Sequence, residues 1–211
     1  MSLAIVCDFG GVLTSPLIQS FVAYQEKSGI PFEELGKAMA RAAEKSGGEY
    51  PLFALEKGEI TEAHFLATIE AELEGDVRLG SLRDTYFEHL HPNERMIDYM
   101  RELRARGLRM ALLTNNVREW EPHWRAKLPD VEEIFEVIVD SAFVGMRKPD
   151  PRIYELTVER LGGGVQASDC VFVDDTDVNC RAAEELGMRA VQFRDAEQAI
   201  AEIESIVRPG T

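Results

Sequence analysis

Four short groups of polar residues in the chain each come after an apolar run that is typical of a buried strand. Asp8 follows the run at residues 3–7 and is itself followed by Gly10 and Gly11, so that its carboxylate stands on a turning backbone. The other three groups are Thr114-Asn115, Arg147-Lys148-Pro149 and Asp174-Asp175. Ligand sites in open parallel sheets lie outside the carboxyl ends of the strands, and we therefore expect the four groups to converge on one cleft.

The residue types in these groups suit a metal ion and an anionic ligand. Two adjacent carboxylates, such as Asp174 and Asp175, repel each other at a strand end unless a positive charge lies beside them. A hard divalent cation with oxygen ligands is the natural partner. Lys148 stands just ahead of prolines that fix the local backbone, and a rigidly placed ammonium can neutralise a phosphate. The Thr114 hydroxyl and nearby backbone N–H groups can bind the same anion.

Each group taken alone also fits an ordinary structural role. An Asp ahead of glycines, as at Asp8, is typical of a turn. Thr114 and Asn115 can cap the helix that follows them. Lys148 can be a solvated side chain before a helix that starts at Pro151. A helix cap accounts for one of the two adjacent aspartates but less easily for both, so the functional interpretation depends on all four groups together.

The elements that must position these groups form an alternating pattern. Five apolar runs alternate with amphipathic stretches: the runs are 3–7, 108–113, 134–139, 170–173 and 190–193, and the stretches are 94–106, 117–127, 151–161 and 179–186. This pattern predicts an α/β fold in which helices flank both faces of a Rossmann-like parallel sheet. Residues 15–92 contain no convincing strand and show helical spacings. We expect two domains: a core of residues 1–14 and 93–211, and a helical cap at 15–92, inserted after the first strand.

Composition limits the partners and the location. The chain has 23 basic and 38 acidic residues, a net charge of −15, and this negative field disfavours nucleic acid and membrane surfaces as partners. No apolar run approaches the roughly 20 residues that span a bilayer, and the first residues lack a signal peptide, so we expect a cytoplasmic protein. The three cysteines are widely spaced and form no CxxC pair, and we expect them to be reduced and to act as small apolar residues.

The order of the four groups resembles a known signature. Asp-x-Gly-Gly-Val, Thr-Asn, Lys-Pro and Asp-Asp together resemble the four motifs of the haloacid dehalogenase-like hydrolase superfamily, and the resemblance covers nearly the whole chain. The ending Val-Phe-x-Asp-Asp-x-x-x-Asn at residues 171–179 is similar to that of the phosphatase-like N-terminal domain of soluble epoxide hydrolases and related sugar-phosphate phosphatases. The helical insert resembles the cap of that family, and residues 55–61 resemble its substrate-facing loop.

The resemblance implies a role for each matching residue. The catalytic residues would be Asp8 as nucleophile, Lys148 and Thr114. The ligands of a Mg²⁺ ion would be Asp8, the backbone carbonyl of Gly10, Asp174 and Asp175. Residues in contact with a small, phosphorylated substrate would be Asn115, Gly11 and Glu59, although Glu59 also fits a solvated carboxylate at a helix start. Asn179 would brace the loop of the paired aspartates. The sequence does not separate Asp174 from Asp175, and it leaves the substrate and the oligomeric state open.

One position departs from the pattern of these phosphatases. Two residues after the nucleophile they mostly carry a second Asp, which protonates the leaving group and then activates water; here that residue is Gly10. General acid–base catalysis contributes about 10²–10⁴-fold to a rate. We therefore expect aryl and acyl phosphates to react faster than alkyl phosphates, unless another group such as Thr14 or Glu59 acts as the acid.

Three functions are compatible with these residues. A Mg²⁺-dependent phosphatase that works through an aspartyl-phosphate on Asp8 is favoured, because a metal ion balances the charges of Asp8, Asp174 and Asp175. A 2-haloacid-type dehalogenase is the second, since a halide needs no acid at Gly10. The third is a catalytically weak domain of the same fold that is retained for binding.

Overall fold

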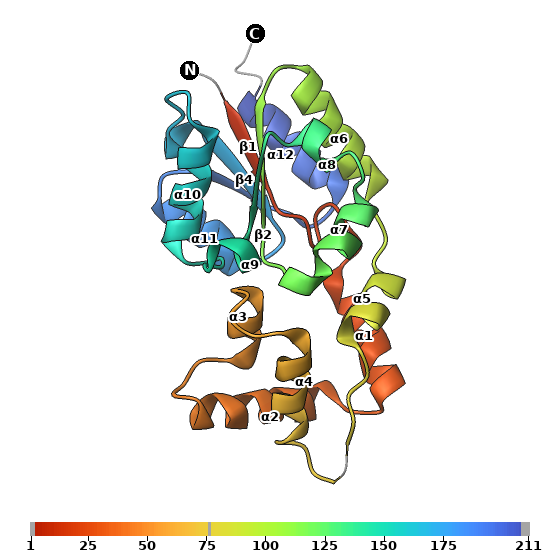
Figure 1. Cartoon of the computed structure of the whole chain (residues 1–211). Coiled ribbons are helices and arrows are strands. Elements are labelled where there is room, and N and C mark those ends of the chain that lie inside the picture. Colours follow the sequence, from red (N-terminus) through yellow and green to blue (C-terminus); the bar gives the residue numbers. More distant parts are fainter. Residues whose placement is uncertain (1–2, 76, 208–211) are drawn as a thin grey trace.

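The computed structural model describes residues 3–75 and 77–207. Five parallel strands form one sheet in the order β3-β2-β1-β4-β5 (Figure 1). The strands are β1 (Ala4–Cys7), β2 (Arg109–Thr114), β3 (Val137–Asp140), β4 (Cys170–Asp174) and β5 (Arg189–Gln192). Strand β1 lies at the centre, where Cys7 is in register with Leu112 of β2 and Val173 of β4. The predicted α/β fold with a parallel sheet is confirmed.

Both faces of the sheet are covered by helices, because the strands are apolar on both sides. Ile5 and Cys7 of β1 belong to one core cluster, whereas Ala4 and Val6 belong to the other. The helices after residue 93 that contribute to the first cluster are α6 (Glu94–Ala105), α7 (Glu121–Lys127), α8 (Val131–Ile134) and α12 (Ala196–Val207). The helices that contribute to the second are α10 (Pro151–Leu161) and α11 (Asp177–Glu185). Cys7, Cys170 and Cys180 are unpaired and buried, as expected.

Two predicted boundaries were wrong. The apolar run at 134–139 was expected to be one strand, but Ile134 ends helix α8 and β3 starts only at Val137. Ile134 is buried in the same way as a strand residue, so a helix end and the next strand look like one run in the sequence. The stretch at 117–127 is a short 3₁₀ turn, Arg118–Trp120, followed by α7.

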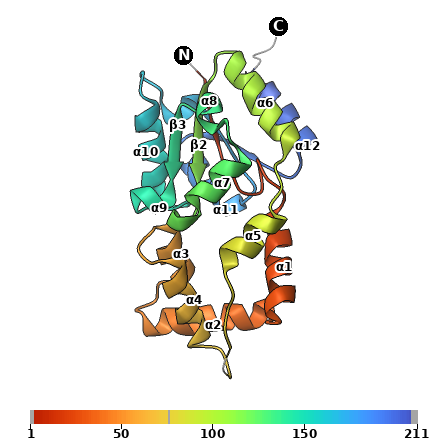
Figure 2. The same cartoon turned by 45° about the vertical axis from the view of Figure 1, so that its right-hand side comes forward.

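The segment between β1 and α6 is helical and lies beyond the carboxyl ends of the strands (Figures 1 and 2). Its helices are α1 (Leu17–Ser28), α2 (Phe32–Lys45), α3 (Pro51–Glu56), α4 (Glu62–Glu70) and α5 (Leu82–His89). We call this segment, residues 15–92, the insert. The chain enters and leaves it at one place, where Thr14 and Pro92 form a β-bridge and the Ser15 amide donates to the His91 carbonyl at 2.7 Å.

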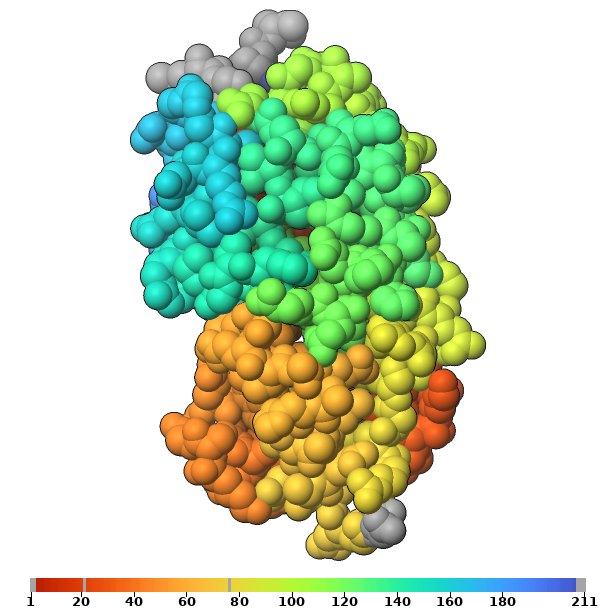
Figure 3. Space-filling model, in the orientation of Figure 1, coloured from red at the N-terminus to blue at the C-terminus, as the bar shows by residue number. Residues whose placement is uncertain are grey.

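The insert packs against the sheet part, where the orange and yellow atoms adjoin the green ones in Figure 3. Hydrogen bonds cross this boundary: the Trp120 indole donates to Glu62 Oε2 at 2.9 Å, and the Ser141 hydroxyl donates to the Glu56 carbonyl at 2.6 Å. These contacts fix the insert over the end of the sheet that carries the polar groups. Within the described part of the chain, no helix has the length and apolar character needed to cross a membrane.

Candidate active site

The polar groups named from the sequence come together at the carboxyl ends of the central strands. Asp8 follows β1, Thr114 ends β2 and Asp174 ends β4, and Lys148 reaches them from the loop before α10. Asp8, Thr114 and Lys148 line a cavity of about 480 Å³. Gly10, Asn115 and Asp175 line it as well. The expected convergence on one cleft is therefore found.

Lys148 is the centre of the charge network. Its side chain is 1% exposed, and its Nζ lies 2.8 Å from Asp8 Oδ1 and 2.6 Å from Asp174 Oδ2. The two carboxylates raise the pKa of the Lys148 ammonium against the effect of its burial, so it stays charged. A solvated surface lysine, the alternative considered from the sequence, is excluded by this burial.

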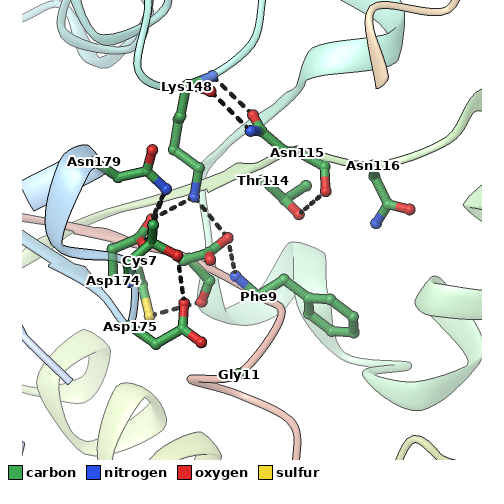
Figure 4. A network of polar contacts seen from close by, with 12 residues as sticks. Cys7, Phe9, Gly11, Thr114, Asn115, Asn116, Lys148, Asp174, Asp175 and Asn179 are labelled. Atoms are coloured by element: carbon green, nitrogen blue, oxygen red, sulfur yellow. Dashed lines mark hydrogen bonds and ion pairs between the residues drawn. The ribbon is translucent and has the colours of Figure 1, made fainter. Parts of the chain in front are cut away.

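Asn115 holds Lys148 in place through the backbone. Its Nδ2 donates to the Lys148 carbonyl at 3.0 Å, and the Lys148 amide donates back to its Oδ1 at 2.8 Å (Figure 4). The side-chain amide of Asn115, predicted to bind substrate, therefore already has partners, although the residue lines the cavity. Neither Thr114 nor Asn115 caps the next helical turn, whose N-cap is Val117.

The two adjacent aspartates have different surroundings. Asp174 is fully buried, and both of its oxygens are engaged: Oδ2 with Lys148, and Oδ1 with the Thr176 amide at 2.8 Å and Asn179 Nδ2 at 3.1 Å. Asp175 lines the cavity instead, and its Oδ1 accepts from the Thr176 hydroxyl at 3.1 Å. Asp175 is thus the better placed of the two to bind a ligand directly, while Asn179 braces Asp174.

Three carboxylates in the site can hold a metal ion. Ligand atoms of Asp8, Asp174 and Asp175 all lie within 4.8 Å of one another. Burial raises the pKa of Asp8 to about 7, with Lys148 opposing this rise and Asp174 adding to it. Burial and then Asp174 also raise the pKa of Asp175. Closely spaced carboxylates that are costly to ionise are the donor set that a hard cation with oxygen ligands fits.

Gly11 gives Asp175 the space that it occupies. Gly11 has a φ of 79°, a left-handed conformation that favours glycine, and a β-carbon there would lie 2.3 Å from Asp175 Oδ2. Gly11 itself is not among the residues that line the cavity. In this structure the lack of a side chain at Gly11 allows the turn after β1 to approach the loop of Asp175 closely. The substrate contact expected from the sequence stays a prediction.

The structure places Glu59 outside the cavity of Asp8. Glu59 forms an ion pair with Lys57 at 2.9 Å and lines a neighbouring cavity. Glu56, three residues earlier in the same predicted loop, lines the cavity of Asp8 and forms an ion pair with Arg147. Pro51 at the first helical position starts α3 and so sets which side chains of this segment face inward. Thr14 does not line the cavity either: its hydroxyl accepts from the Gly11 amide at 3.0 Å.

Four cavity residues of the described chain come from the insert: Leu17, Phe53, Glu56 and Tyr86. None of them was named as a site residue from the sequence, although Glu56 lies in the predicted substrate-facing loop at 55–61. Arg147 was part of a recognised group but received no role. Its guanidinium lies 4.1 Å from the centre of the Phe53 ring and so joins the insert to the loop of Lys148. The sequence contains one indication that Arg147 lies near the site, namely its position directly before Lys148.

Comparison with known proteins adds the family context. The model of the family described as haloacid dehalogenase-like hydrolase matches residues 3–187. Acyl-CoA dehydrogenase family member 10 of Mus musculus is 30% identical over 97% of this chain, and bifunctional epoxide hydrolase 2 of Sus scrofa is 28% identical over 96%. The chain spans only 19% and 38% of these two relatives. The predicted similarity to epoxide hydrolases is confirmed over this share of their length.

A third relative and a solved structure match along most of their length. Phosphatase MT3486 of Mycobacterium tuberculosis (strain CDC 1551 / Oshkosh) is 30% identical over 89% of this chain and 85% of its own. A crystal structure of the HAD family enzyme BT-2542 from Bacteroides thetaiotaomicron has a TM-score of 0.71 and 22% identity, and covers 99% of both chains. That enzyme has also been solved with magnesium and inorganic phosphate, at a TM-score of 0.64 and 23% identity, covering 92% of this chain and 95% of its own.

Proposed function

The chain belongs to the haloacid dehalogenase-like hydrolase family, and on that premise we propose that it is a Mg²⁺-dependent phosphatase of a small phosphorylated metabolite. Asp8 would be the nucleophile and would carry the phosphoryl group as an aspartyl-phosphate. The observation that carries the proposal is the position of Asp175, which lines the same cavity as Asp8 and brings a ligand atom within 4.8 Å of it.

The charges of the site favour a metal-dependent phosphatase over a dehalogenase. Asp8, Asp174 and Asp175 contribute −3 and Lys148 contributes +1, which leaves −2. A phosphate dianion would be repelled by this charge, whereas a bound Mg²⁺ would cancel it and polarise the phosphoryl oxygens. Asp8 and Asp175 would bind the ion directly, and Asp174 would add negative charge next to them. The Gly10 carbonyl remains a predicted ligand. The phosphatase name of the M. tuberculosis relative supports the same choice.

The residues of the chain have separate tasks in this proposal. Asp8 attacks phosphorus with the carboxylate oxygen that does not face Lys148. Lys148 orients Asp8 and neutralises charge on the transferred group, because its Nζ contacts Asp8 Oδ1 directly. The Thr114 hydroxyl, which lines the cavity, binds a phosphoryl oxygen. The insert, residues 15–92, acts as a cap that excludes water, since four of its side chains line the cavity.

Turnover of para-nitrophenyl phosphate by the purified protein tests this function. We expect hydrolysis that requires added Mg²⁺ and stops with a chelator. Chloride release from 2-chloropropionate, independent of Mg²⁺, would instead establish a dehalogenase. Absence of both reactions would favour a domain of this fold retained for binding.

A further inference from the structure

The insert lies beyond the carboxyl ends of the strands (Figure 1) and supplies part of the lining of the cavity of Asp8. Asp8 lies on the sheet side, so a phosphoryl group that is bound there directs its ester oxygen toward the insert. Among the described residues, the insert contributes two apolar side chains, Leu17 and Phe53, and two polar ones, Glu56 and Tyr86. A group that protonates the leaving oxygen, which Gly10 cannot do, is therefore to be sought in Glu56 or Tyr86.

Glu56 is poorly suited to donate a proton. Its Oε2 accepts a charge-assisted hydrogen bond from Arg147 Nε, and a proton on that carboxyl would weaken this pair. Burial raises the pKa of Glu56, and Arg147 offsets only part of this rise. Glu56 also holds the guanidinium of Arg147 beside the Phe53 ring, so its carboxylate already has a structural task.

Tyr86 presents a neutral donor in a fixed position. Its ring packs on Trp120, with centroids 4.9 Å apart, and against the edge of Phe87 at 5.1 Å. The Ser20 hydroxyl of α1 donates to the Tyr86 carbonyl at 3.1 Å and so ties α5 to the helix that carries Leu17. These contacts hold the side chain on the insert side of the cavity of Asp8.

The surroundings of Tyr86 keep its hydroxyl protonated. Burial is the largest cause of the raised pKa of the Tyr86 phenol, and it acts whether or not a metal ion offsets the charges of Asp8 and Asp175. A phenol with a raised pKa is a weak acid toward water, but it can protonate an alkoxide as the ester bond breaks, and its conjugate base is strong.

Resting on the phosphatase function proposed above, we propose that Tyr86 is the catalytic acid and base of this enzyme and replaces the side chain that Gly10 lacks. In the first step Asp8 forms a bond to phosphorus, the bond from phosphorus to the ester oxygen breaks, and that oxygen takes the electron pair and the phenol proton. The alcohol leaves, and Tyr86 is a phenolate. In the second step water attacks phosphorus, the phenolate takes a proton from the water, and the bond to Asp8 breaks to release inorganic phosphate.

Tyr86→Phe keeps the ring contacts and removes only the hydroxyl. We expect kcat/KM for an alkyl phosphate such as glycerol phosphate to fall by about 10²-fold or more. With para-nitrophenyl phosphate the leaving group needs no acid, so the first burst of nitrophenolate should keep its rate while the later steady-state rate falls. Tyr24→Phe is the matched control, because Tyr24 donates to the Gly80 carbonyl within the insert and does not line this cavity.

Several results would overturn this role. Equal slowing of the burst and of the steady state, or an unchanged rate with alkyl phosphates, would show that Tyr86 is not the acid. A steep dependence of the wild-type rate on leaving-group pKa would show that no group donates a proton, whatever the variant does. No Mg²⁺-dependent turnover of any phosphate by the wild type would contradict the phosphatase function itself and is thus distinguishable from a failure of the Tyr86 role alone.

Discussion

Leu17 packs directly against Gly10. A β-carbon built at Gly10 would lie 3.3 Å from both methyl carbons of Leu17, and Gly10 does not have a left-handed backbone conformation. The backbone at Gly10 therefore accepts a side chain, and the obstacle to one is the tight contact with Leu17. The first turn of α1, which carries Leu17, therefore packs against the turn after Asp8, and this contact leaves little space for an acidic side chain at Gly10.

This contact predicts how an acid can be introduced. Gly10→Asp alone should gain little, since the new side chain must displace Leu17. Gly10→Asp with Leu17→Ala should hydrolyse alkyl phosphates faster than Leu17→Ala alone, by part of the 10²–10⁴-fold that general acid catalysis supplies, and the gain should be largest when Tyr86→Phe is also present. Steady-state rates with alkyl and aryl phosphates measure this. If Gly10→Asn with Leu17→Ala performs equally well, the gain does not come from proton transfer.

Mg²⁺ should stabilise the protein through Asp175. A ligand that binds only the folded state at 100 times its Kd adds about 2.7 kcal/mol to the free energy of unfolding, which for a chain of this length raises Tm by about 5–10 °C. Thermal unfolding with Mg²⁺ and with a chelator measures the shift. Asp175→Ala should remove it, whereas Asp177→Ala, an exposed residue paired with Arg181, should not. An unchanged Tm of the wild type at millimolar Mg²⁺ would argue against the metal site.

Asp140 should make stability depend on pH. Burial raises its pKa to about 6, although the Ala142 amide that it caps lowers it. Since the pKa is higher in the folded state than the usual 3.8, the resulting stabilisation is present below about pH 4 and is lost as pH rises through about 6. Between pH 4 and 7 the wild type should therefore lose about 1–3 kcal/mol of unfolding free energy relative to Asp140→Asn. Urea unfolding at several pH values measures this, and parallel curves for the two proteins would contradict it.

The sheet and the convergence of the polar groups were predictable because strand patterns are short and strict. A continuous apolar run that is followed by Asp8, or that ends in Asp174, places the carboxylate at the carboxyl end of a buried strand, independently of how the neighbouring helices pack. The parallel order of the strands then brings their carboxyl ends together, so the convergence of the polar groups on one cleft followed from topology. The exact start of β3 did not follow, because the buried end of α8 continues the same apolar run.

The insert side of the cavity was not predictable in the same way. Helical spacing indicates apolar faces within residues 15–92, but it does not show which neighbour each face meets, so Leu17 and Tyr86 were not placed at the site. Glu56 and Glu59 lie on one predicted loop, and only the start of α3 at Pro51 decides that Glu56 faces Asp8. Likewise, the pairing of Asp174 with Lys148, which leaves Asp175 for a ligand, depends on distances that the sequence does not contain.

The proposed mechanism requires Asp8 as the nucleophile. Asp8→Asn keeps the shape of the side chain and leaves Lys148 paired with Asp174, so the protein should fold with an unchanged or higher Tm. An amide is a poor nucleophile, and Mg²⁺-dependent turnover of para-nitrophenyl phosphate should fall below about 1% of the wild-type rate. Asp177→Asn serves as the matched control and should keep its activity. Turnover by folded Asp8→Asn above a few per cent of wild type, in a preparation free of other phosphatases, would contradict the proposed mechanism.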